Sequence, residues 1–151
     1  MDNILSCVKG FAQGRIITVF GCGGNRDRRK RPLMGNAAAA YSDLVIVTSD
    51  NPRDENPEAI IDEIVRLTQW NGVAHIACED RSEAIRQAVC SARAGDVIVL
   101  AGKGHENYQV FENERTVHFD ERETLAEIVG QIRASGCSDR IAPCVSKVNL
   151  L

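Results

Sequence analysis

Short apolar runs alternate along the chain with segments whose apolar residues recur at helical spacing. Asn56-Pro57 and Asp80 followed by Glu83 mark helix starts between the runs, because such residues suit the free N–H groups of a first turn. Runs that are almost continuously apolar are typical of strands buried on both faces of a parallel sheet. The alternation therefore predicts a parallel sheet covered by helices. The four runs span residues 15–20, 44–48, 73–77 and 97–100.

The pattern changes after the fourth run. Residues 108–111 and 116–119 predict two strands around a Glu-Asn-Glu turn, and a last helix is expected to start near Asp120. We therefore expect an α/β fold over residues 14–133. It is a Rossmann-like, three-layer domain with a mostly parallel sheet and an antiparallel hairpin at one edge. Residues 1–13 are expected to form a partly helical lead-in, and residues 134–151 a poorly ordered tail.

Composition and charge narrow the classes of function. The 151 residues carry a net charge of −3, with 44% hydrophobic and 26% charged residues. These values are ordinary for a globular domain and give no electrostatic reason to expect nucleic acid or a membrane as partner. No apolar stretch approaches the roughly 20 residues that span a bilayer, and residues 1–14 lack the pattern of a secretory signal. The six cysteines include no Cys-x-x-Cys pair, which favours a reduced, cytoplasmic protein without a metal site.

Polar residues gather where three of the predicted strands end, and the first cluster spans residues 21–31. It reads Gly21-Cys22-Gly23-Gly24-Asn25-Arg26-Asp27 and continues with four more cations. Glycines there allow a ligand to approach the backbone, and Arg26 lies directly against them. The cluster is not a dinucleotide fingerprint, because Arg26 occupies the place of the third glycine. The simpler interpretation of residues 28–31 is a solvated basic run.

The second and third clusters follow the second and fourth strands. In Asp50-Asn51-Pro52-Arg53 the guanidinium can grip a carboxylate or phosphate at two points, although Asn-Pro turns also occur without any function. Gly102-Lys103-Gly104-His105-Glu106 offers Glu106 as an acceptor for a cation; its His-Glu step could be a base and an acid, or could simply line a pocket. The carboxyl ends of parallel strands meet at one sheet edge. Together, Arg26, Arg53 and Glu106 would suit a ligand with both a carboxylate and an ammonium, as in an amino acid.

These clusters, in this order and spacing, resemble the C-terminal domain of the Mur ligase family. The resemblance is greatest to the MurE group, the UDP-N-acetylmuramoyl-L-alanyl-D-glutamate ligases, and covers residues 14–129. It is carried by residues 19–35, by 101–106, and by Asp50-Asn51-Pro52-Arg53, which is similar to the family's recognition motif for meso-diaminopimelate. Asn25 and Arg28-Arg29 depart from the family's usual residues, at positions not expected to contact substrate.

The resemblance implies an ATP- and Mg²⁺-dependent ligase of peptidoglycan precursor synthesis. ATP phosphorylates the D-glutamate γ-carboxylate of the nucleotide-linked dipeptide, and the amine of meso-diaminopimelate attacks the acyl phosphate. The resemblance further implies which residues bind diaminopimelate, none of them catalytic. Arg26, Asn51 and Arg53 are expected to bind its carboxylates. Gly102 and Glu106 are expected to bind its far ammonium group. Asp50 and Pro52 complete the recognition motif.

Some parts of that ligase are not found in this sequence. They are the Gly-x-x-Gly-Lys-Thr/Ser loop that binds ATP, the metal-binding and modified-lysine residues of the central domain, and the uridine-nucleotide domain. We therefore expect a piece of a longer ligase, with the N-terminal and central domains as its partners, that binds the amino acid weakly and catalyses nothing alone. Two other interpretations stay open: a Rossmann-like module for a nucleotide or phosphate, and a non-catalytic Mur ligase homologue that acts as an interaction domain.

Overall fold

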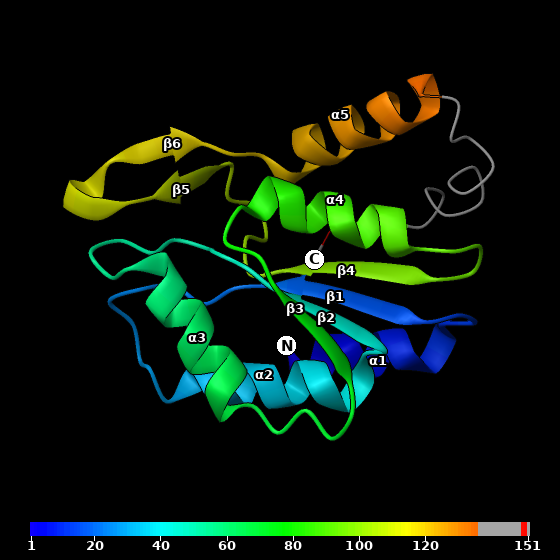
Figure 1. The fold of residues 1–151 in the computed structure, drawn as a ribbon, viewed down its shortest axis with the longest axis horizontal. Coiled ribbons are helices and arrows are strands. Elements are labelled where there is room, and N and C mark those ends of the chain that lie inside the picture. Colours follow the sequence, from blue (N-terminus) through cyan, green and yellow to red (C-terminus); the bar gives the residue numbers. More distant parts are fainter. Residues whose placement is uncertain (136–148, 151) are drawn as a thin grey trace.

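A parallel sheet forms the centre of the computed structural model, which describes residues 1–135 and 149–150 (Figure 1). The strand order is β3-β2-β1-β4-β7, so β1 lies between β2 and β4 and pairs with both in parallel. All four strands predicted from the apolar runs are present. The strands of this sheet are β1 (Ile16–Phe20), β2 (Leu44–Val47), β3 (Ala74–Ala77), β4 (Val97–Ala101) and β7 (Asn149–Leu150).

Helices cover the two faces of the sheet as separate layers (Figure 1). One face carries α1 (Asp2–Phe11), α2 (Lys30–Tyr41) and α3 (Pro57–Leu67). The other carries α4 (Arg81–Ser91) and α5 (Glu121–Ala134), which lie next to each other and share one core with the sheet. The predicted three-layer α/β architecture is therefore confirmed. Among the described residues, no helix combines the length and the apolar character needed to cross a bilayer.

The predicted hairpin also forms. Its strands β5 (Tyr108–Val110) and β6 (Thr116–His118) pair antiparallel around a short 3₁₀ helix at Glu112–Glu114. They make a two-stranded sheet of their own, so the backbone ladder of the parallel sheet does not include them. The hairpin extends past the end of the parallel sheet instead (Figure 1).

Alternate residues of the central strands supply two cores. Ile17 and Val19 of β1 face the core shared with α4 and α5. Ile16 and Phe20 face the core shared with α1, α2 and α3. Because a strand turns successive side chains to opposite faces, a strand buried on both sides is apolar at almost every position, as the sequence pattern predicted. The buried Thr18 of β1 is an exception, and its hydroxyl forms a hydrogen bond with that of Ser42. The outlying strand β3 differs, since all four of its residues are exposed.

The two ends of the chain were expected to lie outside the domain. In the structure, α1 is a ten-residue helix, and its Leu5 and Val8 are buried in the core beneath the sheet. At the other end α5 stops at Ala134, and residues 149–150 pair with β4 as β7. The remainder of the predicted tail lies outside the described residues.

One carboxylate joins the starting ends of β1 and β4. Asp96 is buried and accepts hydrogen bonds from the Arg15 backbone N–H at 2.9 Å, from Arg15 Nε and Nη2 at 3.1 and 2.6 Å, and from the Arg93 N–H at 2.9 Å. Burial alone would raise the pKa of Asp96, but the hydrogen bonds from Arg15 and Arg93 hold that pKa below the usual aspartate range. The charged form of Asp96 therefore stabilises the fold.

We predict that Asp96→Asn lowers the free energy of unfolding by on the order of 2 kcal/mol at neutral pH, because charge-assisted hydrogen bonds are lost. The wild-type contribution is present above the aspartate pKa of the unfolded chain, about 3.9, and is lost as the pH falls through the lower folded pKa. Urea unfolding at several pH values measures this. Asp62→Asn, on the exposed side of α3, is the matched control. Equal losses in both variants would contradict the prediction.

Candidate functional site

Three loops that follow β1, β2 and β4 meet at one edge of the sheet. They line a pocket of about 490 Å³ that includes Gly21 and Arg26 from the first loop, Asp50 from the second and Gly102 from the third. The loops converge because β1 lies between β2 and β4 and all three strands run in the same direction. Each of the three predicted clusters thus contributes to one cavity, but Asn51, Arg53 and Glu106 are not among the residues that line it.

Glycines in the first loop allow it to touch the second loop directly. The Gly24 N–H donates to the Asn51 carbonyl at 2.9 Å. A methyl group added at Gly24 would lie 1.8 Å from the Pro52 carbonyl oxygen, and one at Gly21 would lie 2.4 Å from the Thr48 oxygen. The sequence suggested that these glycines admit a ligand to the backbone. At these two positions the close neighbour is instead the other loop.

The basic run is largely neutralised by carboxylates. Arg28 pairs with Glu63 at 2.8 Å and Arg29 with Asp27 at 3.0 Å. Arg31, which was expected in a solvated run, is only 2% exposed and pairs with Glu55 and Glu63. Within residues 1–135 and 149–150, Arg26 and Lys30 have no ion-pair partner. These two cations line the pocket and are available to an anionic ligand.

Hydrogen bonds from one guanidinium nitrogen and from the backbone N–H fix the position of Arg53. Its Nη1 donates to the Gly24 carbonyl at 2.9 Å, and its backbone N–H donates to the Val110 carbonyl at 3.0 Å. The residue has a φ of +52°, a left-handed conformation that costs a side-chain-bearing residue about 1 kcal/mol. Nε and Nη2 have no hydrogen-bond partner in the described part of the chain, so a two-point donor remains for a carboxylate.

Arg26 and Arg53 flank the same glycine. A methyl group at Gly23 would lie 2.9 Å from Arg53 Nη1 and 3.5 Å from Arg26 Cγ. Arg26 is exposed and Arg53 half-buried. The two arginines therefore approach Gly23 from different loops, and both side chains begin or end beside it.

Asn51, Lys103 and Glu106 form a single hydrogen-bonded cluster. Asn51 Oδ1 accepts from Lys103 Nζ at 2.7 Å and from the Val110 N–H at 3.0 Å, while Asn51 Nδ2 donates to Glu106 Oε2 at 2.9 Å. Asn51 is 4% exposed, so a single N–H of its amide is left for a ligand. Lys103 was not predicted as a site residue.

Three other predicted residues have clear positions. Pro52 is buried in the contact with Gly24. Asp50 lines the pocket, and its buried Oδ1 has no conventional hydrogen bond; its nearest charged partner is Lys103 Nζ, at an ion-pair distance of 3.3 Å. Gly102 has a φ of +116°, and a methyl group added to it would lie 3.8 Å from Asp50 Oδ2. His105, by contrast, is exposed.

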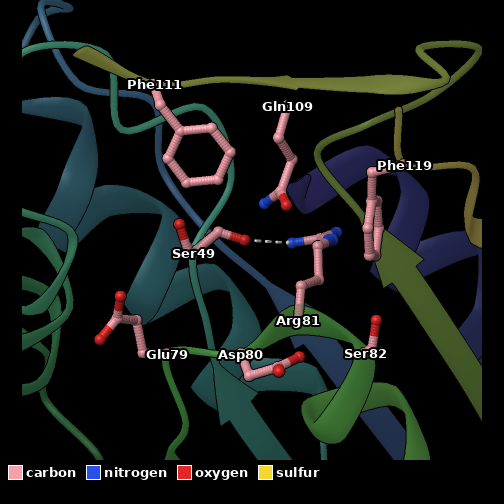
Figure 2. Close-up of a pocket in the computed structure, with 8 residues that line it drawn as sticks. All are labelled: Ser49, Glu79, Asp80, Arg81, Ser82, Gln109, Phe111 and Phe119. Carbon is pink, nitrogen blue, oxygen red and sulfur yellow. Dashed lines mark hydrogen bonds between the residues drawn. The ribbon is translucent and has the colours of Figure 1, made fainter. Parts of the chain in front are cut away.

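A buried arginine holds the ends of β2 and β4 beside the site. Arg81 Nη1 donates to the Ser49 carbonyl at 3.1 Å and Nη2 to the Ala101 carbonyl at 3.0 Å, while Nη2 also pairs with Glu121 at 2.7 Å. Figure 2 shows this side chain reaching between Ser49 and Phe119 in an adjoining pocket of about 520 Å³. Sequence reasoning missed Arg81, because its place in the first turn of α4 gives no sign of burial.

Neither nucleophilic nor metal chemistry is indicated at this edge. Burial raises the pKa of the Cys22 thiol to about 12, even though the positive charge of nearby Arg31 acts in the opposite direction. The thiol is therefore protonated at neutral pH. Three or more His, Cys, Asp or Glu side chains suited to a metal ion do not come together anywhere in residues 1–135 and 149–150. The arrangement can bind a charged small molecule through arginines and a carboxylate.

We predict that Gly24→Ala separates the first two loops, because its methyl group cannot share space with the Pro52 carbonyl. The expected cost is on the order of 2 kcal/mol of unfolding free energy, as for other overpacked sites. Denaturant unfolding measures it. Gly130→Ala, in α5 with nothing within 4 Å of the added methyl group, is the control and should be neutral or stabilising. An unchanged midpoint for Gly24→Ala would refute the close contact.

Comparison with known proteins identifies the family of this chain. The family model described as Mur ligase, glutamate ligase domain, matches residues 1–104. The chain is 47% identical over 132 residues to UDP-N-acetylmuramoyl-L-alanyl-D-glutamate–2,6-diaminopimelate ligase 1 of Clostridium acetobutylicum. It is 53% identical over 130 residues to UDP-N-acetylmuramoyl-L-alanyl-D-glutamate–2,6-diaminopimelate ligase of Clostridium perfringens. The matches cover 87% and 85% of this chain but 27% and 26% of the relatives.

A solved structure supports the same relationship. The structure titled UDP-N-acetylmuramoyl-L-alanyl-D-glutamate–2,6-diaminopimelate ligase superposes with a TM-score of 0.81 at 40% sequence identity. The match again covers 87% of this chain and 27% of that one. The chain thus spans about a quarter of the length of the relatives it matches. It belongs to the Mur ligase family.

Proposed function

We propose that this chain is the amino-acid-binding C-terminal domain of an ATP-dependent ligase that adds meso-diaminopimelate to UDP-N-acetylmuramoyl-L-alanyl-D-glutamate, a step of peptidoglycan precursor synthesis. The names of the relatives from Clostridium supply the two substrates. The short span of the match, 27% of the first relative, supports a domain rather than a whole enzyme. The carrying observation is that two arginines with unused donors and a partly exposed carboxylate lie on loops at one sheet edge.

The reaction forms one amide bond and consumes one ATP. The terminal phosphoryl group of ATP passes to the γ-carboxylate of D-glutamate, which gives an acyl phosphate and ADP. An amine of diaminopimelate then attacks the acyl carbon, loses a proton and displaces inorganic phosphate. The role of this domain is to hold the amino acid so that its attacking amine reaches the acyl phosphate, which lowers the entropic cost of the encounter.

The carboxylates of diaminopimelate are assigned to Arg26, Asn51 and Arg53. Arg53 offers the unused Nε and Nη2 pair, whose planar fork matches a carboxylate. Arg26 has its Cγ near Gly23, as Arg53 has its Nη1, and it has no carboxylate of this chain within ion-pair distance among the described residues. Asn51 has one amide N–H left, and it lies in the same turn as Arg53.

The far ammonium is assigned to Glu106 and Gly102. The Glu106 side chain is 32% exposed, so part of its carboxylate is open to a cation while Oε2 accepts from Asn51. Asp50 and Pro52 complete the site by shaping the turn. Lysine lacks the second carboxylate of diaminopimelate, and the arginine fork would then have no partner. The site around Arg53 should therefore favour the diacid.

ATP and Mg²⁺ belong to the proposed ligase and bind mainly to its other domains. This sequence contains no Gly-x-x-Gly-Lys-Thr/Ser loop, the segment that binds the nucleotide in the Mur ligase family. Lys30, which also lines the pocket and has no ion-pair partner among the described residues, remains available to an anionic group of a substrate held by a neighbouring domain. We place this ligase in the cytoplasm, and the cysteines within the described residues support a reducing compartment because they form no disulfide: Cys7, Cys22, Cys78 and Cys90.

Replacing Arg53 tests the carboxylate assignment. In the complete ligase, Arg53→Ala or Arg53→Lys should raise the Michaelis constant for meso-diaminopimelate roughly tenfold or more, because a two-point charged hydrogen bond is lost. The constants for ATP and for the nucleotide substrate should stay within about twofold, since other domains bind them. Steady-state kinetics with each substrate varied in turn gives all three constants.

The matched control is Arg66→Lys, an exposed arginine in the last turn of α3, which should leave every constant unchanged. If Arg53→Lys keeps full apparent affinity for diaminopimelate, Arg53 is only part of a turn. A similar rise in all three constants, together with a lower melting temperature, would also identify a purely structural role.

The second test concerns the isolated chain. A pure sample of these 151 residues should neither hydrolyse ATP nor form an amide bond, because the phosphate-binding loop is missing. Release of inorganic phosphate and formation of the tripeptide product, each measured with and without the chain, provide the data. Turnover above background in a rigorously purified sample would show that the domain carries chemistry of its own and would contradict the proposal.

A further inference from the structure

Lys103 is a cation buried at the centre of the candidate site. It is 2% exposed, and its Nζ donates to Asn51 Oδ1 at 2.7 Å and to the Tyr108 carbonyl at 2.6 Å, with Asp50 Oδ1 at 3.3 Å. An ammonium has three N–H groups; two of them donate to Asn51 and Tyr108, and Asp50 Oδ1 lies at ion-pair distance. Because the Lys103 side chain is fully buried, it is not positioned to contact a ligand directly.

The donors around Asn51 decide which way its amide points. Oδ1 faces two donors, Lys103 Nζ and the Val110 N–H, so both of its lone pairs are used. The amide nitrogen must then face the other way, toward Glu106 Oε2 at 2.9 Å. A reversed amide would place its nitrogen against two donors and its oxygen against a carboxylate. The contact with Lys103 is the charged one and therefore the stronger of the two.

Glu106 is oriented by the same group. Its Oε2 accepts from Asn51 and lies 3.8 Å from Lys103 Nζ, so one side of the carboxylate is drawn inward. The side chain remains 32% exposed, and its outer part is left for a cation from solvent. Lys103 thus contacts, directly or through one amide, two residues assigned above to opposite charges of the amino acid.

A buried ammonium is a costly way to fill this space. Burial lowers the pKa of Lys103, although the charge of Asp50 opposes the change. Replacing a buried ionic group by an apolar residue of similar size is often neutral or stabilising. Packing alone therefore gives little reason for lysine at this position, whereas orienting an amide and a carboxylate requires a donor that reaches both.

We propose that Lys103 is a positioning residue that fixes Asn51 and Glu106 in the orientation in which they receive the carboxylate and the ammonium of the incoming amino acid. The proposal rests on the proposed function, because it concerns the same site. It adds that recognition depends on a side chain that never touches the substrate.

A double-mutant cycle in the complete ligase tests this role. Lys103→Met keeps the length of the side chain without its charge, and we expect the Michaelis constant for meso-diaminopimelate to rise roughly tenfold. Asn51→Ala should raise the same constant. If Lys103 acts through Asn51, the Michaelis constant of the double variant should exceed that of Asn51→Ala alone by less than about threefold. Lys9→Met, an exposed lysine of α1, is the control.

The alternatives give different results. A merely structural lysine would yield multiplicative effects in the double variant, with the constants for ATP and the nucleotide substrate rising too, and either result overturns the proposal. An unchanged constant in Lys103→Met also overturns it. Should Lys103→Met fail to fold, Lys103→Gln replaces it in the same cycle. If the wild-type ligase adds another amino acid, the proposed function is wrong. The role of Lys103 is then tested by the same double-mutant cycle, with the Michaelis constant of that amino acid measured instead.

Discussion

The parallel pairing of β1 with both β2 and β4 is the constraint on which the site depends. It brings three loops from distant parts of the chain to one edge, where each can contribute a different chemical group. The contact between the first two loops is backbone to backbone, from the Gly24 N–H to the Asn51 carbonyl. A residue with a side chain does not fit at position 24, because the Pro52 carbonyl occupies the space that its Cβ would need.

The hairpin is the second support of the site, although it lies outside the parallel sheet. Its first strand binds the Asp50–Arg53 turn through three hydrogen bonds: Arg53 N–H to the Val110 carbonyl, Val110 N–H to Asn51 Oδ1, and Gln109 Nε2 to the Asp50 carbonyl. These bonds hold Arg53 in its left-handed conformation. Strain of this kind persists where the surroundings impose it, and it is often found at functional sites.

The charges at this edge divide into two groups. Arg31, Arg81 and Lys103 are buried, and each is paired with carboxylate, amide or carbonyl oxygens of the protein, although Arg31 Nε has no hydrogen-bond partner among the described residues. These charges bind other groups of the protein, because a buried charge must be paired to be tolerated. Arg26, the outer donors of Arg53 and part of Glu106 keep unused capacity. A zwitterionic ligand would complete this second group, and that complementarity is the physical basis of the proposed function.

Four strands of the parallel sheet, the hairpin and the order of the three loops could be predicted from the amino-acid sequence. The apolar runs predict buried strands because both faces are covered, and Asn56 and Asp80 cap their helices as predicted, accepting from the Ala59 and Glu83 N–H groups. Which polar residues are buried depends instead on how these elements pack together. The partners of Lys103 and Arg81 include oxygens 52 and 40 residues away in the chain. No local pattern records such contacts, because they arise only when the strands pair and the hairpin closes over their ends.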